Sequence, residues 1–263
     1  MQNLRKHGQS PYIIAAIHGG PGAPGEMAPV ARELESTCGV LEPLQTATSL
    51  QGQVDELNDV LTKHGDLPIT LIGYSWGAWL SYILAAKHPD MVMKLILVGS
   101  GPFEEKYAAG IMRARLDRLS DQDKARVVSA LEILDDPDAE DKNSSFAQFG
   151  ELLSKADVFN SIVEDSAVSE TIDCQVEVFM GVWESAAELR RSGKLLEMGK
   201  QIKCPVTAIH GDYDPHPAEG VKKPLARIIK DFQFHLLEKC GHKPWAEQYA
   251  RDRFYEILRK ELD

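Results

Sequence analysis

Residues 69–87 read ITLIGYSWGAWLSYILAAK, and this stretch decides the expected fold class. Its β-rich apolar start leads directly into Gly73-Tyr74-Ser75-Trp76-Gly77, and apolar residues at helical spacing follow. We therefore expect a strand, a sharp turn and a helix, in that order. Such a turn strains the serine backbone and crowds the neighbouring segments, so glycine is required two residues before and two residues after the serine.

Ser75 is the nucleophile that this turn predicts. The turn lifts the hydroxyl clear of the sheet and holds it at the N-terminus of a helix, whose dipole favours developing negative charge. Chance alone places a G-x-S-x-G in a chain of this composition about one time in ten. The assignment therefore depends on the flanking strand and helix, and the alternative is an ordinary glycine-flanked turn without chemistry.

The chain before residue 104 alternates β-rich apolar runs with longer amphipathic segments, which is typical of a parallel sheet with crossover helices. We expect strands at 12–17, 39–44, 69–73 and 95–98, and helices at 26–36, 50–64 and 76–88. These residues predict an α/β fold.

Residues 104–203, called the insertion below, show no strand pattern. Helical spacing occurs at 111–119, 121–134 and 146–153, with breakers such as Asp136-Pro137-Asp138. Strand-like runs return at 206–209 and 232–237, around a helix at 222–229, and a helix is expected at 245–262. We therefore expect one core built from residues 1–103 and 204–263, interrupted by helices.

Composition narrows the class of partner. The 263 residues carry 29 Lys and Arg against 40 Asp and Glu, a net charge of −11, which disfavours binding to nucleic acid or to anionic membranes. The apolar run at 12–17 is too short to span a membrane, and no signal-peptide cleavage site follows it. A cytoplasmic protein is expected.

The four cysteines, Cys38, Cys174, Cys204 and Cys240, are widely spaced. They contain no C-x-x-C pair and no zinc-ligand spacing, so free thiols are expected and no metal site is predicted.

The first strand runs into His18-Gly19-Gly20-Pro21-Gly22. Acyl transfer needs two N–H donors aimed at the carbonyl oxygen that gains charge, one after the nucleophile and one in this earlier loop. Trp76 and Gly20 are therefore the predicted oxyanion donors. A phosphate-binding loop is the alternative, but the Lys-Ser/Thr ending and the G-x-G-x-x-G spacing are missing.

A serine hydroxyl needs a histidine to accept its proton and a carboxylate to orient that histidine. Asp212 and Asp214 follow the strand at 206–209, and His242 follows the last strand on a glycine turn. We predict Ser75, Asp214 and His242 as the triad, in the chain order expected for this fold, with Asp212 as the weaker alternative.

Three further histidines are expected to play supporting roles. His210 and His216 are predicted neighbours of the acid. His18 is expected to shape the oxyanion loop rather than to titrate.

Together, the motifs at 18–22, 73–77, 211–214 and 241–242 resemble the α/β-hydrolase superfamily. His-Gly-Gly-Pro-Gly with Ser-Trp-Gly is similar to the prolyl iminopeptidase branch in particular. The resemblance implies the triad and donors named above, a helical cap over the site and hydrolysis without a cofactor. It also favours Asp214, since the family acid is usually the last residue of a G-x-x-D turn.

Two features depart from that branch. Residues 42–49 read EPLQTATS where those peptidases usually carry an Asp-Gln-Arg-Gly-x-Gly-x-Ser run. Only about ten residues precede the first core strand, too few for the antiparallel hairpin that usually opens the fold, so we expect a trimmed sheet of six parallel strands.

The substrate is less well determined. The insertion holds 21 acidic against 13 basic residues, a net charge of −8, whereas the remainder carries −3. Glu177, Glu184 or Glu188 would bind a substrate's amino terminus, or simply coat solvated helix faces. Trp183, with Trp76, Trp79 and Trp245, is a candidate for an acyl or aromatic pocket; Trp183 and Glu184 are our predicted substrate contacts.

The predicted function is a serine hydrolase that cleaves a small-molecule ester or amide through an acyl-enzyme. One alternative is a prolyl iminopeptidase-like aminopeptidase acting on short peptides. Another is a non-catalytic ligand receptor on the same fold, and a third is carbon–carbon bond cleavage by the same triad.

Overall fold

The strand before Ser75 lies in the middle of the sheet. In the computed structural model, which describes residues 3–136, 138–162 and 175–262, β4 (Ile69–Tyr74) lies between two other parallel strands and is buried along its whole length. The described residues form a seven-stranded sheet in the order β1-β3-β2-β4-β5-β6-β7. The other strands are β1 (Leu4–His7), β2 (Tyr12–Ile17), β3 (Gly39–Pro43), β5 (Val92–Val98), β6 (Val206–Gly211) and β7 (Phe232–Leu237).

The strand order reverses between β2 and β4. The chain passes from β2 outward to β3, then returns to the other side of β2 to form β4 and continues outward through β7. The loops that leave β2 and β4 therefore start side by side at the carboxyl edge of the sheet, where open α/β sheets bind ligands. This topology places His18–Gly22 next to Ser75.

The expected α/β sheet with six parallel strands, β2 to β7, is confirmed, but the N-terminal residues add a strand that we did not expect. β1 pairs antiparallel with β3, from Leu4 opposite Pro43 to His7 opposite Val40. Four residues are enough to form this strand, because each of them pairs with a residue of β3. The run LRKH has no apolar alternation to reveal it, and its charged side chains suit an edge strand, where they discourage pairing with another chain.

Helices cover both faces of the sheet. α1 (Ala28–Leu34) and α10 (Arg251–Leu262) pack on one face, against alternate strand residues such as Ile72 and Ile96. The opposite face, which carries Leu71 and Leu95, packs against α2 (Leu50–His64), α3 (Trp76–Lys87), α8 (Lys194–Met198) and α9 (Glu219–Ile228). Because both faces are covered, the central strands are buried along their whole length, which agrees with the β-rich apolar runs from which the sheet was predicted.

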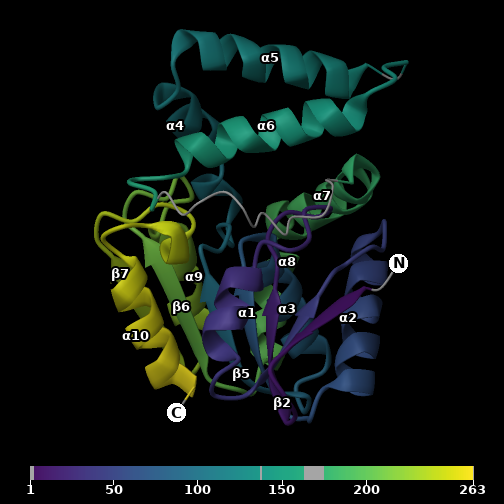
Figure 1. Ribbon diagram of the computed structural model, residues 1–263, viewed down its shortest axis with the longest axis vertical. Helices are drawn as coiled ribbons and strands as arrows, with labels where there is room; N and C mark the ends of the chain where they lie inside the picture. The colour runs from purple at the N-terminus through teal and green to yellow at the C-terminus, as the bar shows by residue number, and fades with distance from the viewer. Residues whose placement is uncertain (1–2, 137, 163–174, 263) are drawn as a thin grey trace.

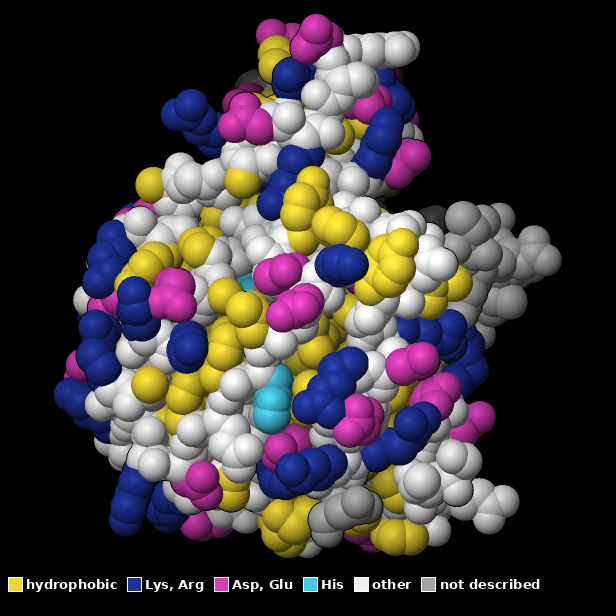
Figure 2. Space-filling view, turned by 90° about the vertical axis from the view of Figure 1, so that its left-hand side faces the viewer, with side chains coloured by type: hydrophobic (Ala, Val, Ile, Leu, Met, Phe, Trp, Pro, Cys, Tyr) yellow, Lys and Arg dark blue, Asp and Glu magenta, His cyan; other side chains and the backbone are white. Residues whose placement is uncertain are grey.

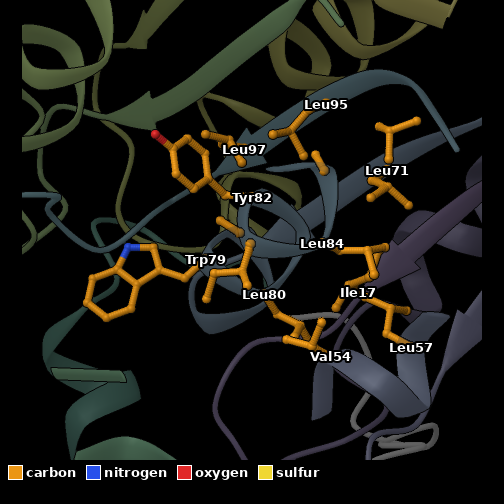
Figure 3. Packing of buried hydrophobic residues seen from close by; sticks show 14 of the residues in the cluster. Ile17, Val54, Leu57, Leu71, Trp79, Leu80, Tyr82, Leu84, Leu95 and Leu97 are labelled. Carbon is orange, nitrogen blue, oxygen red and sulfur yellow. The ribbon is translucent and has the colours of Figure 1, made fainter. Parts of the chain in front are cut away.

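The helix that follows Ser75 is the most deeply buried of the chain's described helices. In α3 every residue from Trp76 to Ala86 is buried. Figure 3 shows Leu80 and Leu84 of α3 between the sheet residues Leu71 and Leu95 and the residues of α2. The helix that carries the nucleophile is thus fixed on all sides.

The described residues of the insertion fold into helices above the carboxyl edge of the sheet (Figure 1). α5 and α6 lie side by side, with a small apolar cluster that includes Val127 and Leu152. The helices are α4 (Ile111–Asp117), α5 (Asp121–Asp135), α6 (Lys142–Ala156), α7 (Val176–Arg191) and the short α8 named above, with 3-10 helices η1 (Glu105–Tyr107) and η3 (Gly199–Gln201) at the two ends.

α7 lies in the segment expected to be helical, although its own range was not among those named. It buries Val178, Val182 and Ala186 against the core. One helical expectation needs correction. The last helix begins at Arg251 rather than at 245, because Pro244–Ala246 forms a 3-10 turn (η4) first.

Cys38, Cys204 and Cys240 are free thiols, and Cys174 lies outside the described residues. Among the described helices, none combines the length and apolar character needed to cross a bilayer. On the face seen in Figure 2, acidic and basic side chains are interspersed.

Two glycines of the insertion test how it rests on the core. A Cβ at Gly181 in α7 would overlap the Thr48 carbonyl group, whereas a Cβ at Gly150 in α6 would meet open space. We expect Gly181→Ala to lower the free energy of unfolding by about 1–3 kcal/mol through overpacking. Gly150→Ala should raise it by about 0.5–1 kcal/mol, because glycine is costly inside a helix.

Urea denaturation followed by circular dichroism checks both variants. Equal effects of the two substitutions would mean that α7 does not rest on the Thr48 loop as described.

Candidate active site

The turn at Ser75 has the strained geometry that its sequence predicted. Ser75 has φ 51° and ψ −113°, in a region that residues other than glycine rarely adopt, and its N–H donates to Val98 O at 2.9 Å. A Cβ at Gly73 would overlap the Gly77 carbonyl, and one at Gly77 would overlap the carbonyl oxygens at the end of β2. Both glycines are thus required by close backbone approach.

Three side chains from distant parts of the chain meet at this turn. His242 Nε2 lies 3.0 Å from Ser75 Oγ, and His242 Nδ1 lies 2.7 Å from Asp214 Oδ2. Because an ionised carboxylate only accepts hydrogen bonds, Nδ1 carries the proton and Nε2 is left to accept from the serine hydroxyl. The structure brings together the three residues predicted as the triad.

Asp212, the weaker candidate for the acid, is placed differently. Asp212 is an exposed residue, and its Oδ1 accepts a hydrogen bond from the backbone N–H of Cys240 at 3.1 Å. Asp214 alone of the pair contacts His242.

Asp214 is buried among histidines. Burial by itself would raise its pKa, but the charges of His242, His210 and His216, with a hydrogen bond from His216, hold the pKa well below its ordinary value. Its Oδ1 accepts both the backbone N–H and Nδ1–H of His216, each at 2.9 Å. The carboxylate is therefore charged and held through both oxygens.

His216 is a second imidazole in the site. Burial lowers its pKa to about 4, against the opposing effect of Asp214, so it is neutral at pH 7. Its ring stacks on that of His242 with the centroids 4.6 Å apart. The sequence analysis placed His216 beside the acid but did not predict that it lines the cavity next to Ser75.

The insertion holds His242 from the other side. The backbone N–H of His242 donates to Asp157 O at 2.8 Å, just after α6. Arg115 of α4 donates to both oxygens of the Asp157 carboxylate, at 2.7 and 2.6 Å. Sequence reasoning missed Asp157 and Arg115, because no motif links two residues that are so far apart in the chain.

The loop after β2 has the features expected of an oxyanion loop. Gly20 has φ +44°. His18 Nε2 accepts the N–H of Gln45 at 3.3 Å, so Nδ1 carries the proton and donates to Gly19 O at 2.7 Å. Burial lowers the pKa of His18, so the ring is neutral and acts as a structural tie.

The two predicted donors have no competing acceptor. Neither the Gly20 N–H nor the Trp76 N–H donates to another residue in the described part of the chain. Both amides are therefore free to receive an oxygen.

A cavity of about 220 Å³ opens beside Ser75. Trp183, one of the predicted substrate contacts, lines it and stacks on Trp79 with the ring centroids 6.1 Å apart and the planes 4° apart. Trp245 packs instead against Tyr74, at the base of the site.

The acidic candidates lie outside this cavity. Glu184, the other predicted contact, has a side chain 76% exposed and pairs with Arg191, as does Glu188. Glu177 lines a separate hollow near the start of α6. The charged residues that line the Ser75 cavity, within the described ranges, are Arg115 and Arg190.

Comparison with known proteins agrees with this geometry. A model of the alpha/beta hydrolase fold family matches residues 3–247. The chain is 25% identical over 209 residues to the pimeloyl-[acyl-carrier protein] methyl ester esterase of Neisseria meningitidis serogroup A, and the match covers 75% of this chain but only 59% of that protein. The serogroup C protein of the same name is 26% identical, with 75% of this chain and 72% of that protein covered.

Solved structures show the same fold. VinJ superposes with a TM-score of 0.71 at 18% identity, over 98% of this chain and 93% of VinJ. A thermophilic esterase from Thermogutta terrifontis gives a TM-score of 0.64 at 20% identity, over 98% and 92% of the two chains. The narrower resemblance to prolyl iminopeptidases stays a prediction. Because the family model matches nearly the whole chain, this protein belongs to the alpha/beta hydrolase fold family.

Proposed function

We propose that this protein is a serine hydrolase that cleaves a small-molecule ester or amide through an acyl-enzyme intermediate. The observation that carries the proposal is the hydrogen-bond chain Ser75–His242–Asp214. The N–H groups of Trp76 and Gly20, which have no competing acceptor among the described residues, are the proposed oxyanion donors.

The reaction follows from these contacts. Ser75 Oγ attacks the carbonyl carbon while His242 Nε2 takes the hydroxyl proton, and Asp214 stabilises the imidazolium that forms. The N–H groups of Gly20 and Trp76 bind the oxygen as it becomes negative. His242 then gives its proton to the leaving oxygen or nitrogen as that bond breaks. Water attacks the acyl-enzyme by the same sequence and restores Ser75.

An ester is the favoured substrate class. The relatives matched by sequence include methyl ester esterases, which supports an ester over an amide. An aminopeptidase would need a partner for a substrate ammonium, and both charged residues found on the described cavity wall are arginines. The receptor alternative is disfavoured by the alignment of the three triad side chains. Carbon–carbon bond cleavage is tested by substrate trials.

The nucleophile is tested by substitution and labelling. Ser75→Ala should abolish labelling by a fluorophosphonate and lower kcat by about 10⁴-fold or more, because the hydroxyl is the attacking group. Ser81→Ala is the matched control: Ser81 lies in the helix that follows Ser75, and its buried hydroxyl has no hydrogen-bond partner among the described residues.

Mass spectrometry of the adduct and ester turnover are the measurements. Unlabelled wild-type protein, or labelling that survives in Ser75→Ala, would rule out the proposed nucleophile.

The acid is tested by a pair of isosteric variants. Asp214→Asn should lower kcat by about 10⁴-fold, because an amide favours the wrong tautomer of the histidine. Asp212→Asn should have a small effect, since Asp212 contacts only the backbone N–H of Cys240. Steady-state kinetics on an aryl ester measures both, and equal losses in the two variants would contradict the assignment of Asp214.

Because the buried His216 is neutral, we expect the free energy of unfolding to fall at acid pH. Its pKa is about 4 in the folded state and about 6.5 when unfolded, so the unfolded chain binds more protons between these values. Stability is therefore complete above about pH 6.5 and falls as the pH drops toward 4, by up to about 1.4 kcal/mol per pH unit for one site. Asp214 contributes only at the acid end of this range, because its ordinary pKa of 3.8 already lies just below the range and its folded pKa is lower still.

We expect His216→Asn to make the unfolding free energy fall less steeply over this range. Urea titrations at several pH values measure the slope, with His88→Asn as a control away from the site. A slope identical to that of the wild type would show that His216 is protonated equally in both states.

A further inference from the structure

The cavity beside Ser75 combines apolar walls with an arginine, Arg190, that has two nitrogens without a described partner. We propose that it binds a substrate that carries a carboxylate in addition to the ester, and that Arg190 recognises this carboxylate. The proposal rests on the proposed hydrolase function and names the substrate class of the same site.

The charge of the cavity is opposite to that of the protein. The chain has a net charge of −11, and the insertion is more acidic than the rest. Nevertheless the described cavity wall holds two arginines and no carboxylate. Its remaining wall is largely apolar, including Trp76, Trp183 and Met112. A cation beside apolar walls meets a less polarisable surrounding than water, which strengthens its attraction for an anion.

Arg190 is held in place but only partly used. Its side chain is 11% exposed, and its Nε donates to Glu105 at 2.8 Å. Its guanidinium carbon lies 5.5 Å from the centre of the Trp79 ring, and the Trp79 indole N–H is tied to Gly101 O at 3.0 Å. Neither Nη group donates to another described residue. A positioned guanidinium therefore keeps both outer nitrogens for a ligand.

Glu105 neutralises the positive charge of Arg190 only in part. The Glu105 side chain is 49% exposed, so water screens that carboxylate more than it screens the guanidinium. Arg115 differs, because both oxygens of the buried Asp157 accept from its Nε and Nη2. Arg115 therefore holds the insertion beside His242, and Arg190 is the residue with donors to spare.

A carboxylate fits what remains. Its two oxygens match two parallel N–H donors of a guanidinium, and charge-assisted pairs of this kind are stronger than neutral hydrogen bonds. The apolar wall accommodates methylene groups between the carboxylate and the ester. An ammonium group would face like charge instead.

Paired esters test the proposal. The para-nitrophenyl monoesters of succinic, adipic and suberic acid are compared with the para-nitrophenyl esters of butanoic, hexanoic and octanoic acid. We expect wild type to favour at least one acidic member by about tenfold or more in kcat/KM, the size of a hydrogen bond to a charged group. The ratio within a pair cancels differences in the amount of folded enzyme.

Arg190→Met keeps an unbranched apolar side chain and should bring that ratio close to one. Arg191→Met is the matched control, because the adjacent arginine pairs with Glu184 and Glu188 on the surface, and the ratio should stay at the wild-type value. The acetate esters of phenol and of para-hydroxybenzoate form a second pair, which shows whether the carboxylate belongs to the acyl or to the alcohol part.

A wild type that treats the members of every pair alike, or a preference that survives in Arg190→Met, would overturn the proposal. Calorimetric titration of Ser75→Ala with monomethyl adipate and with methyl hexanoate gives a readout without turnover, because only the first ester carries a carboxylate. Tighter binding of monomethyl adipate that is lost in Ser75→Ala/Arg190→Met supports the carboxylate site even if no ester is cleaved. Equal binding, with fluorophosphonate labelling intact, refutes the carboxylate site and leaves the hydrolase proposal standing.

Discussion

The close approach of three backbone segments at Ser75 is the constraint on which the rest of the structure depends. β2 ends, β4 turns and α3 begins within contact distance, and Gly73 and Gly77 are the points at which a side chain would prevent this. The positive φ of Ser75 is tolerated because the surroundings fix it: its N–H is bonded to Val98, and the helix that follows is buried from Trp76 to Ala86. The proposed nucleophile is therefore held at a deeply buried junction of the fold.

The strands and the turns that follow them could be predicted because their local residue pattern agrees with their place in the sheet. The strands that precede Ser75 and Asp214 are buried on both faces and bounded by turn residues, whereas His242 follows the edge strand β7, which is only partly buried. Asp214 could be preferred over Asp212 from its place in the turn, and the contact with His242 agrees with that choice. The catalytic roles of these residues remain proposals that the experiments address.

Sequence reasoning failed where a residue's role depends on a distant partner. β1 has no apolar alternation, and only its pairing with β3 makes it a strand. Glu184 was predicted as a substrate contact because of its negative charge. The structure places Arg190 of the same helix on the cavity wall and Glu184 outside it. Which side of α7 faces the cavity depends on how the helix packs, and the local sequence does not show this. Asp157 contributes a backbone oxygen to His242, and any residue type offers such an oxygen.

The hydrogen bond from the His242 N–H to Asp157 O links the insertion to the histidine. Asp157 belongs to the insertion, and Arg115, which holds its carboxylate, comes from another helix of that segment. The part of the chain that lines the cavity therefore also anchors His242, the proposed general base. A chimera that exchanged the insertion for that of another hydrolase would alter the anchoring of the histidine together with the cavity. In this fold the shape of the cavity and the position of the histidine are coupled through one segment of the chain.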